Sequence, residues 1–281
     1  MNRHSLLYFL RRYIDGYRHH SVSVENVVLS PSALLKGKTA LITGASRGIG
    51  FAIAKQYIDA GANVIGIAKH EATLRGAKEK LGSNFEYIIC DLSDALQLEQ
   101  CFKKALMMSP EIDILVNAAG IKNGQDERFW DFTGEDFDYA ISVNTKAPFF
   151  LSRDAISHYL SRKAKGYIVN VIGIKGSIGE GSPYSISKFG LNGMTKGLAR
   201  RFAPNNIIIN GISPGATMTD TNMSIFEGNY YHTQTPNMRM ANPQEIANIA
   251  LFLVSGMADN LIGAIITSDG GEMLQYSNNR Y

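Results

Sequence analysis

The chain has 281 residues, of which 45% are hydrophobic and 19% are charged, and its net charge at neutral pH is +3. This composition is typical of a packed globular protein and excludes wholesale disorder. A charge so close to zero does not indicate nucleic acid as a partner. The two cysteines, Cys90 and Cys101, match no metal-ligand or redox spacing and suit a reducing cytosol.

No run approaches the roughly 20 apolar residues that a membrane-spanning helix needs. The apolar stretch at residues 6–10 is also shorter than the core of a secretion signal. We therefore expect a cytoplasmic protein. No pair of histidines has metal-ligand spacing, so we expect no metal site.

Residues 1–37 form an N-terminal extension. Leu6, Phe9, Leu10 and Tyr13 recur near helical spacing beside several arginines, which predicts an amphipathic helix. We favour an arm that packs on the parent domain or on a partner subunit. Contact with a membrane surface, which basic amphipathic helices also make, is the alternative interpretation.

Residues 38–281 read as one α/β domain. Short apolar runs alternate with helical patterns such as 49–60 and 191–202, and the runs lie at 40–42, 64–67, 87–89, 112–116, 167–171, 207–209 and 264–266. Runs that are continuous and rich in Ile and Val suit strands buried on both faces of a parallel sheet. The alternation predicts a single Rossmann-type, doubly wound parallel sheet flanked by helices.

The first predicted strand runs into a glycine-rich turn, Thr43-Gly44-Ala45-Ser46-Arg47-Gly48-Ile49-Gly50, which a helix follows. Glycines permit a tight turn and let the backbone approach a pyrophosphate. The helix N-terminus then offers unpaired N–H groups and a partial positive charge to the phosphates. The turn predicts a dinucleotide site formed by Gly44, Ser46, Arg47, Gly48, Ile49 and Gly50.

The spacing Gly-x-x-x-Gly-x-Gly resembles that of the short-chain dehydrogenase/reductase family. Further motifs of that family follow in order, namely Asn117-Ala118-Ala119-Gly120, Asn144, Tyr184-x-x-x-Lys188, Ser213-Pro214-Gly215 through Thr219, and Asp269-Gly270-Gly271. The resemblance covers about residues 36–272 and includes members that reduce 3-oxoacyl groups on a carrier protein, other ketones or sugars.

The resemblance implies a nicotinamide dinucleotide as cofactor, a small carbonyl or alcohol substrate and a homo-oligomer, either dimer or tetramer. It places Asp91 and Leu92 beside the adenine. The remaining cofactor contacts that it implies are Asn117, Ala118, Gly120, Lys188, Pro214, Gly215, Thr217 and Thr219.

The choice between NAD and NADP follows from charge. NAD binders usually carry an acidic residue about 20 positions beyond the glycines, where it bonds the ribose hydroxyls. Ala68 stands at that place, whereas Lys69 and Arg47 supply cations suited to a 2′-phosphate. We therefore predict NADP(H); the alternative is that both cations are ordinary solvated side chains.

Tyr184 and Lys188 are the predicted catalytic pair, since residues four apart share one face of a helix. A neighbouring ammonium and an oxidised nicotinamide favour the phenolate and lower the tyrosine pKa from its ordinary value of about 10. Tyr184 then acts as general acid or base in the interconversion of a ketone and a secondary alcohol. By resemblance, Lys188 also bonds the nicotinamide ribose and Asn144 holds a water.

One expected element is missing, because Gly173 stands where the family usually carries a serine that bonds the substrate oxygen. Ser177 could reach the site through a rearranged loop, whereas Ser182 before Pro183 reads as a helix N-cap. Three interpretations stay open: a slower reductase, another donor, or a dinucleotide-binding scaffold that acts as a sensor or partner subunit with little turnover.

The segment between Thr219 and Asn242 is rich in methionine and aromatic residues. In the family this region covers the substrate, so it suits an apolar or sugar-like ligand under a mobile lid. Packing of ordinary helices against the core explains the same residues almost as well.

Overall fold

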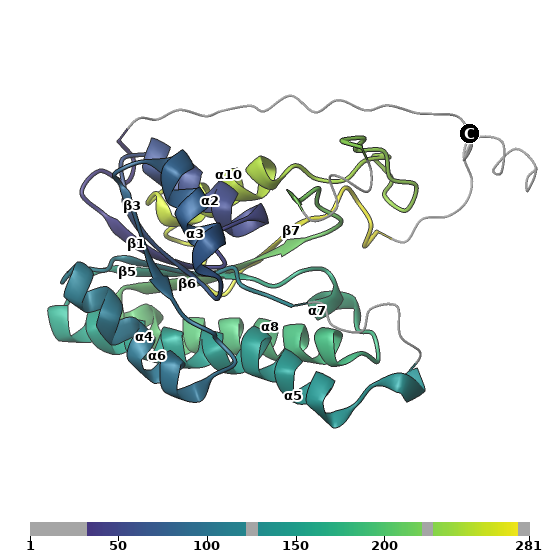
Figure 1. Cartoon of the computed structure of the whole chain (residues 1–281), viewed down its shortest axis with the longest axis horizontal. Helices are drawn as coiled ribbons and strands as arrows, with labels where there is room; N and C mark the ends of the chain where they lie inside the picture. Colours follow the sequence, from purple (N-terminus) through teal and green to yellow (C-terminus); the bar gives the residue numbers. More distant parts are fainter. Residues whose placement is uncertain (1–32, 122–128, 221–226, 275–281) are drawn as a thin grey trace, which may run out of the picture.

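The computed structural model describes residues 33–121, 129–220 and 227–274 (Figure 1). Seven strands form one sheet, namely β1 (Thr39–Thr43), β2 (Asn63–Ala68), β3 (Phe85–Ile89), β4 (Ile114–Asn117), β5 (Gly166–Val171), β6 (Ile207–Pro214) and β7 (Ile265–Ser268). Every neighbouring pair is parallel, in the order β3-β2-β1-β4-β5-β6-β7. The predicted doubly wound parallel sheet is confirmed.

Two layers of helices cover the sheet (Figure 1). The layer above it in this view contains α2 (Gly48–Asp59), α3 (Glu71–Leu81) and α10 (Pro243–Val254). The layer below contains α4 (Ala95–Met108), α5 (Gly134–Ile141), the π-helical turn η2 (Ser142–Lys146), α6 (Ala147–Arg162) and α8 (Pro183–Phe202). The shorter elements are the single turn α7 (Lys175–Ile178) and the 3-10 turns η1 (Phe129–Asp131) and η3 (Ala203–Asn205).

The strands are continuously apolar because both of their faces are buried. Alternate residues enter two separate clusters, so that Ile42 packs in the upper one and Leu41 in the lower one. In β4, Leu115 joins the lower cluster. The upper cluster also contains Leu35, which shows that packing of the domain begins before the expected boundary at Lys38. The rest of the expected extension, residues 1–32, lies outside the described residues.

The chain reverses its direction of winding between β1 and β4. It moves outward from β1 to β3, returns beside β1 as β4, and then continues through β5 to β7. The last residues of the two central strands, Thr43 and Asn117, are register partners. Helices leave this point toward opposite faces (Figure 1). In open α/β sheets, the crevice in which ligands bind lies at such a point, beyond the carboxyl ends of the strands.

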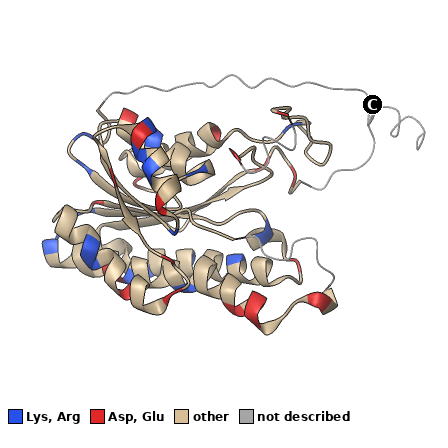
Figure 2. Cartoon of the chain, in the orientation of Figure 1, with Lys and Arg blue, Asp and Glu red and all other residues tan. Residues whose placement is uncertain are grey.

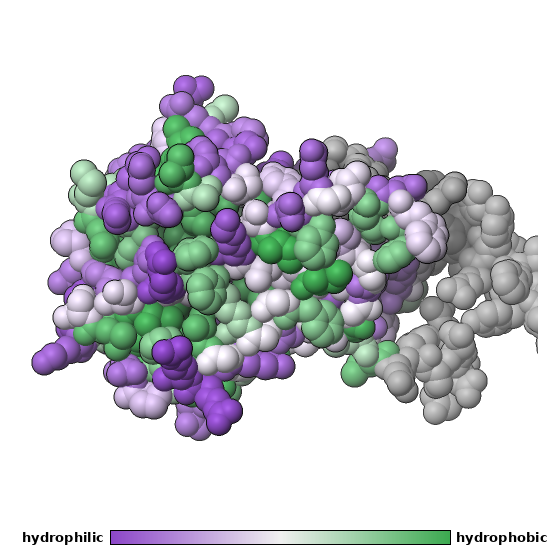
Figure 3. Space-filling model, turned by 90° about the horizontal axis from the view of Figure 1, so that it is seen from below, coloured by the Kyte–Doolittle hydropathy of each residue, from purple (hydrophilic) through white to green (hydrophobic). Residues whose placement is uncertain are grey.

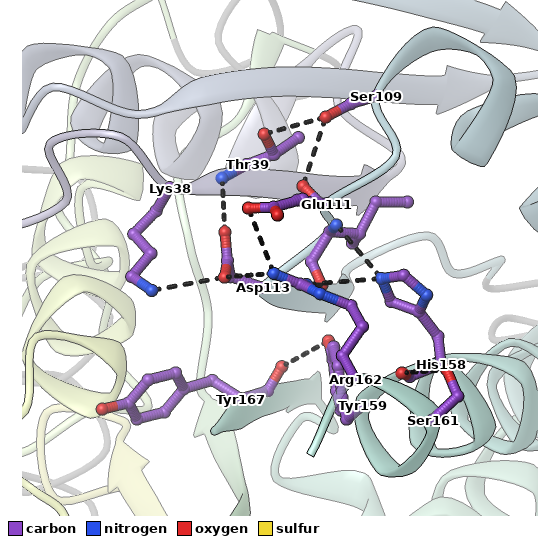
Figure 4. Close-up of polar contacts among 11 residues, drawn as sticks. Lys38, Thr39, Ser109, Glu111, Asp113, His158, Tyr159, Ser161, Arg162 and Tyr167 are labelled. Atoms are coloured by element: carbon purple, nitrogen blue, oxygen red, sulfur yellow. Dashed lines mark hydrogen bonds and ion pairs between the residues drawn. The ribbon is translucent and has the colours of Figure 1, made fainter. Parts of the chain in front are cut away.

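The opposite ends of the same strands are held by a polar network around Asp113 (Figure 4). The Asp113 carboxylate accepts hydrogen bonds from the Thr39 backbone N–H at 3.0 Å and from the Lys38 ammonium at 3.2 Å. Arg162 of α6 lies 3.9 Å from the same carboxylate. The network joins β1, β4 and α6 at the amino ends of the two strands. It therefore lies at the opposite end of the sheet from the carboxyl ends of the strands.

Charged residues lie mainly in the helices and loops, whereas the strands are almost free of them (Figure 2). The lower layer also exposes apolar surface, as its outer view shows (Figure 3). Large side chains that α5, α6 and α8 leave exposed include Phe137, Phe149, Ile186 and Phe189. Within the described residues, no helix combines the length and the hydropathy that crossing a bilayer requires.

Candidate active site

The glycine turn between β1 and α2 is packed so closely that side chains do not fit. A Cβ atom on Gly50 would lie 2.2 Å from the Gly44 carbonyl oxygen. Gly44 has a φ of +70°, and a Cβ atom there would lie 2.9 Å from the Ala119 backbone. Glycine at position 44 therefore lets the turn lie directly against the loop that follows β4, and glycine at position 50 lets α2 begin directly against the turn itself.

Thr43, the last residue of β1, ties this loop to the glycine turn. Its hydroxyl oxygen accepts hydrogen bonds from the backbone N–H groups of Ala118 at 3.1 Å and Ala119 at 3.0 Å. Thr43 was not assigned a role from the sequence. Its position next to the first glycine of the turn indicates a place near the predicted dinucleotide site. Its bonds to the loop after β4 can be predicted only if β4 is known to lie beside β1.

The N-terminus of α2 fits the pyrophosphate of a dinucleotide. Its N-cap residue, Arg47, is extended and its side chain makes no capping hydrogen bond within the described structure. The first N–H groups of the helix are thus left for a ligand at the crevice. Thr219 comes from a distant part of the chain and lies 3.4 Å from where a Gly48 Cβ would be. The structure therefore brings two predicted cofactor segments together.

Asn117 lies beneath the crevice in a polar network. Its amide donates to the Asn170 side chain at 2.8 Å, and Asn170 donates to Thr195 of α8 at 2.9 Å. This chain of hydrogen bonds ties β4 and β5 to α8. The predicted contact of Asn117 with a cofactor stays a prediction.

The predicted Pro-Gly segment begins at the end of β6. A Cβ atom on Gly215 would lie 2.7 Å from Asp269, so this glycine allows β6 and the chain after β7 to approach. Thr217 donates its hydroxyl hydrogen to the Gly215 carbonyl at 3.0 Å. Both residues lie beyond the carboxyl end of β6, on the crevice side of the sheet.

The two predicted cations for a 2′-phosphate have different surroundings. Arg47 is exposed, and its guanidinium forms no hydrogen bond or ion pair with another side chain in the described part of the chain. Lys69, just beyond β2, lies with its ammonium 2.7 Å from the Asp91 carboxylate. The structure thus pairs two residues that the sequence analysis assigned to different parts of the cofactor.

Helix α8 presents Tyr184 and Lys188 on one buried face, as predicted. The helix begins as expected, with Ser182 as N-cap accepting from the Ser185 N–H at 3.2 Å and with Pro183 first. Tyr184 is 7% exposed and Lys188 is 4% exposed. The Lys188 ammonium lies 5.9 Å from the centre of the Tyr184 ring and donates to the Val171 carbonyl at 3.0 Å.

Asn144 holds the first turn of α8 from the π-helical turn η2. Its side-chain amide donates to the Ser187 hydroxyl at 3.0 Å, and its oxygen accepts from the Ile121 N–H at 2.9 Å. The neighbouring Thr145 donates its hydroxyl hydrogen to the Ser187 carbonyl at 2.7 Å. Such single π-helical turns occur frequently at functional sites. Ser187 was not singled out in the sequence.

Gly120 makes room for this arrangement. A Cβ atom on it would lie 3.2 Å from the Lys188 ammonium nitrogen and 3.4 Å from the Asn144 side-chain oxygen. The predicted residues Gly120, Asn144 and Lys188 therefore surround one point at the carboxyl edge of the sheet.

The tyrosine pKa differs from the expectation. Burial raises the pKa of Tyr184 to about 12, and the Glu180 carboxylate adds to the rise. Burial also lowers the pKa of Lys188 to about 8. The expected lowering of the tyrosine pKa by the ammonium is absent, because burial disfavours both charged forms. At neutral pH the phenol of the cofactor-free chain is protonated.

Gly173 confirms that the usual serine is missing beside Tyr184. Its φ is +94°, and a Cβ atom on it would lie 3.2 Å from the Tyr184 hydroxyl oxygen. Among the described residues, no serine or threonine hydroxyl hydrogen-bonds Tyr184. Ser177 lies in α7, and Ser182 is occupied as the helix cap.

The described part of the predicted substrate segment is anchored to α10. Arg239 forms two bonds of 2.8 and 2.7 Å with Glu245 in the first turn of that helix. Met240 is buried. Asn242 caps α10. Residues 221–226 of this segment lie outside the described residues.

Comparison with known proteins agrees with the motif pattern. The family model for short chain dehydrogenases matches residues 38–229. The chain is 32% identical to the 3-oxoacyl-(acyl-carrier-protein) reductase of Aquifex aeolicus over 246 residues, which are 84% of this chain and 98% of that protein. It is 33% identical to a 3alpha-hydroxysteroid dehydrogenase of Mediterraneibacter gnavus, again over 246 residues (84% and 97%).

A solved structure has the same architecture. The 3-ketoacyl-(acyl-carrier-protein) reductase of Brucella melitensis, complexed with NADH, aligns with a TM-score of 0.78 at 26% identity. The alignment covers 85% of this chain and all of that one (100%).

The buried ammonium predicts a gain in stability on its removal. We expect Lys188→Met to raise the free energy of unfolding at pH 7 by about 1–3 kcal/mol, because the lowered pKa measures a burial penalty of that order. The gain should be full below pH 8 and fade toward pH 10.5, as Lys188 loses its proton in the folded chain. Denaturant unfolding at several pH values, with exposed Lys196→Met as control, measures it. A gain that does not depend on pH contradicts the assignment.

Proposed function

The chain belongs to the short-chain dehydrogenase family, and from this premise we propose that it is an NADP(H)-dependent oxidoreductase that interconverts a ketone and a secondary alcohol. One observation carries the proposal. The buried Tyr184 phenol and Lys188 ammonium lie at the carboxyl edge of the sheet, where the loop after β4 also contacts the glycine turn. An acid or base and a dinucleotide site at one crevice suit carbonyl reduction.

Tyr184 is proposed as the general acid. The bound nicotinamide supplies the hydride to the carbonyl carbon or takes it from the alcohol. Tyr184, protonated at neutral pH, donates its proton to the carbonyl oxygen. Lys188 and Asn144 hold the helix turn that carries the phenol, and we assign the nicotinamide ribose to Lys188.

Gly173 supports the expectation of a slow reductase. A site that lacks one preorganised donor to the developing oxyanion loses roughly 3–4 kcal/mol of transition-state stabilisation unless another group replaces it. The same observation motivates the second candidate function, a dinucleotide-binding scaffold that acts as a sensor or partner subunit. Retention of Tyr184, Lys188 and Asn144 favours the enzyme.

The substrate proposed is a 3-oxoacyl or keto-sugar type ketone. The relatives include proteins named as 3-oxoacyl reductases and one named as a hydroxysteroid dehydrogenase. Both names describe the conversion of a ketone or of a secondary alcohol. The apolar Met240 and the tyrosines at 230 and 231 lie in the segment proposed to cover it.

NADP(H) is favoured by the charges around the end of β2. No carboxylate stands at position 68, and Arg47 presents an exposed guanidinium beside the glycine turn. A guanidinium binds phosphate through charge-assisted hydrogen bonds. The Brucella relative was solved in complex with NADH. The proposal of NADP(H) for this chain is therefore based on its own residues and not on that relative.

A homo-oligomer is proposed on the resemblance and on the apolar surface of α5, α6 and α8 (Figure 3). Exposed apolar patches of this kind mark surfaces at which proteins associate.

Removal of the Tyr184 hydroxyl tests the mechanism. We expect Tyr184→Phe to lower kcat/KM for ketone reduction by about 10²–10⁴, the range that general acid catalysis contributes, while the Kd of NADPH stays unchanged. Initial rates with a panel of ketones measure this. Tyr167→Phe is the matched control, since its hydroxyl bonds Asp259 outside the site. Equal turnover by wild type and Tyr184→Phe would refute the role. A wild type that binds NADPH but reduces no ketone would support the scaffold.

Removal of the Arg47 guanidinium tests the cofactor. We expect Arg47→Ala to weaken NADPH binding at least about tenfold, because a bond to a charged group contributes about 1.5–3 kcal/mol. NADH, which has no 2′-phosphate, should bind within about twofold of wild type. Titration calorimetry measures both, with exposed Arg200→Ala at the far end of α8 as control. Equal losses for the two nucleotides would contradict the phosphate contact.

A further inference from the structure

The ends of β2 and β3 bring an ammonium and a carboxylate together beside the proposed adenosine site. The strands are parallel, with Ala68 and Ile89 in register, and the Cys90 N–H donates to the Ala68 carbonyl at 2.9 Å. The next residues along the two strands include Lys69 and Asp91, whose charged groups meet at 2.7 Å. The pair is thus a consequence of strand pairing and not of chance side-chain placement.

Asp91 is the fixed member of the pair. One of its carboxylate oxygens accepts from the Ser93 N–H at 3.0 Å and from the Ser93 hydroxyl at 2.7 Å. Its own N–H donates to the Gln97 side chain at 2.9 Å. The other carboxylate oxygen faces Lys69. The Asp91 side chain is 21% exposed and that of Lys69 is 50% exposed, so the lysine can swing away whereas the carboxylate stays.

The net charge that a 2′-phosphate would meet here is therefore less positive than Arg47 and Lys69 alone indicate. Arg47 is exposed and has no side-chain partner within the described residues. The Asp91 carboxylate neutralises the charge of Lys69. If a phosphate drew the Lys69 ammonium toward itself, the fixed carboxylate of Asp91 would remain beside the negatively charged phosphate. A 2′-phosphate near this carboxylate would meet a like charge, and that repulsion would weaken phosphate binding.

We propose that Asp91 is a specificity-determining residue that restrains the preference of this chain for NADP(H) by neutralising Lys69 and repelling a 2′-phosphate. The inference rests on the proposed function, because it requires a dinucleotide in this crevice. Arg47 then supplies most of the phosphate recognition, and Lys69 contributes fully only when the carboxylate is absent. NAD(H), which carries ribose hydroxyls in place of the phosphate, does not meet this repulsion.

Asp91→Asn tests the proposal, since it removes the charge and keeps the shape of the side chain. With the full chain and calorimetric titration, we expect the Kd of NADPH to fall about fivefold, the size of a partly exposed charge interaction. The adenine expected beside Asp91 is common to both nucleotides, so the decisive readout is the Kd of NADPH divided by that of NADH, which should fall about fivefold. Glu86→Gln is the matched control: it removes the same charge from β3 and breaks a 2.6 Å ion pair with Lys78, away from the crevice.

A double-mutant cycle with Lys69→Met separates the charge effect from a general disturbance. We expect Lys69→Met to weaken NADPH binding by less than about twofold in wild type and by about fivefold in the Asp91→Asn background, because only there is the ammonium free. An unchanged NADPH to NADH ratio in Asp91→Asn, or equal costs of Lys69→Met in both backgrounds, overturns the inference.

The outcomes also separate this inference from the proposed function. A wild type that prefers NADH, with a ratio that still shifts toward NADPH in Asp91→Asn, contradicts the proposed cofactor and supports the role of Asp91. A chain that binds neither nucleotide in any variant overturns both.

Discussion

The Lys188 ammonium is enclosed by protein, and much of the surrounding structure accommodates it. Within the described residues it has one hydrogen-bond acceptor, the Val171 carbonyl at the end of β5. Gly120 leaves space beside it. Gly176 lets α7 approach the backbone of α8, where a Cβ atom would lie 2.7 Å from the Lys188 carbonyl oxygen. Burying a charge costs stability, so a chain that retains this cation does so for its chemistry.

The loop after β4 couples this cation to the glycine turn. On one side, its backbone at Ala119 packs against Gly44 and donates a hydrogen bond to the Thr43 hydroxyl. On the other side Gly120 borders Lys188 and Asn144. The described part of this loop, residues 118–121, thus lies between the helix end that suits a pyrophosphate and the helix face that carries Tyr184.

Local patterns were sufficient to predict much of this arrangement. The strands, the glycine turn, the Ser182 cap and the shared face of Tyr184 and Lys188 depend on residues near one another in the sequence, and the structure confirms them. The absence of the family serine at position 173 was also evident from the sequence. The Lys69–Asp91 pair was not, because it depends on β2 and β3 lying side by side. The direction of the Tyr184 pKa depends on burial, which spacing along a helix does not reveal.

Burial raises the pKa of the Tyr184 phenol, and we propose that the positive charge of a bound oxidised nicotinamide would lower it again. A pH titration with and without nucleotide tests this proposal most directly. The chain has 13 tyrosines, so the tyrosinate absorbance of Tyr184→Phe must be subtracted from that of wild type. We predict no difference up to about pH 10 without nucleotide and, with oxidised NADP, a phenolate signal that appears at least about two pH units lower, since a nearby cation favours the charged form. A phenolate that forms at the same pH with and without nucleotide would contradict the account.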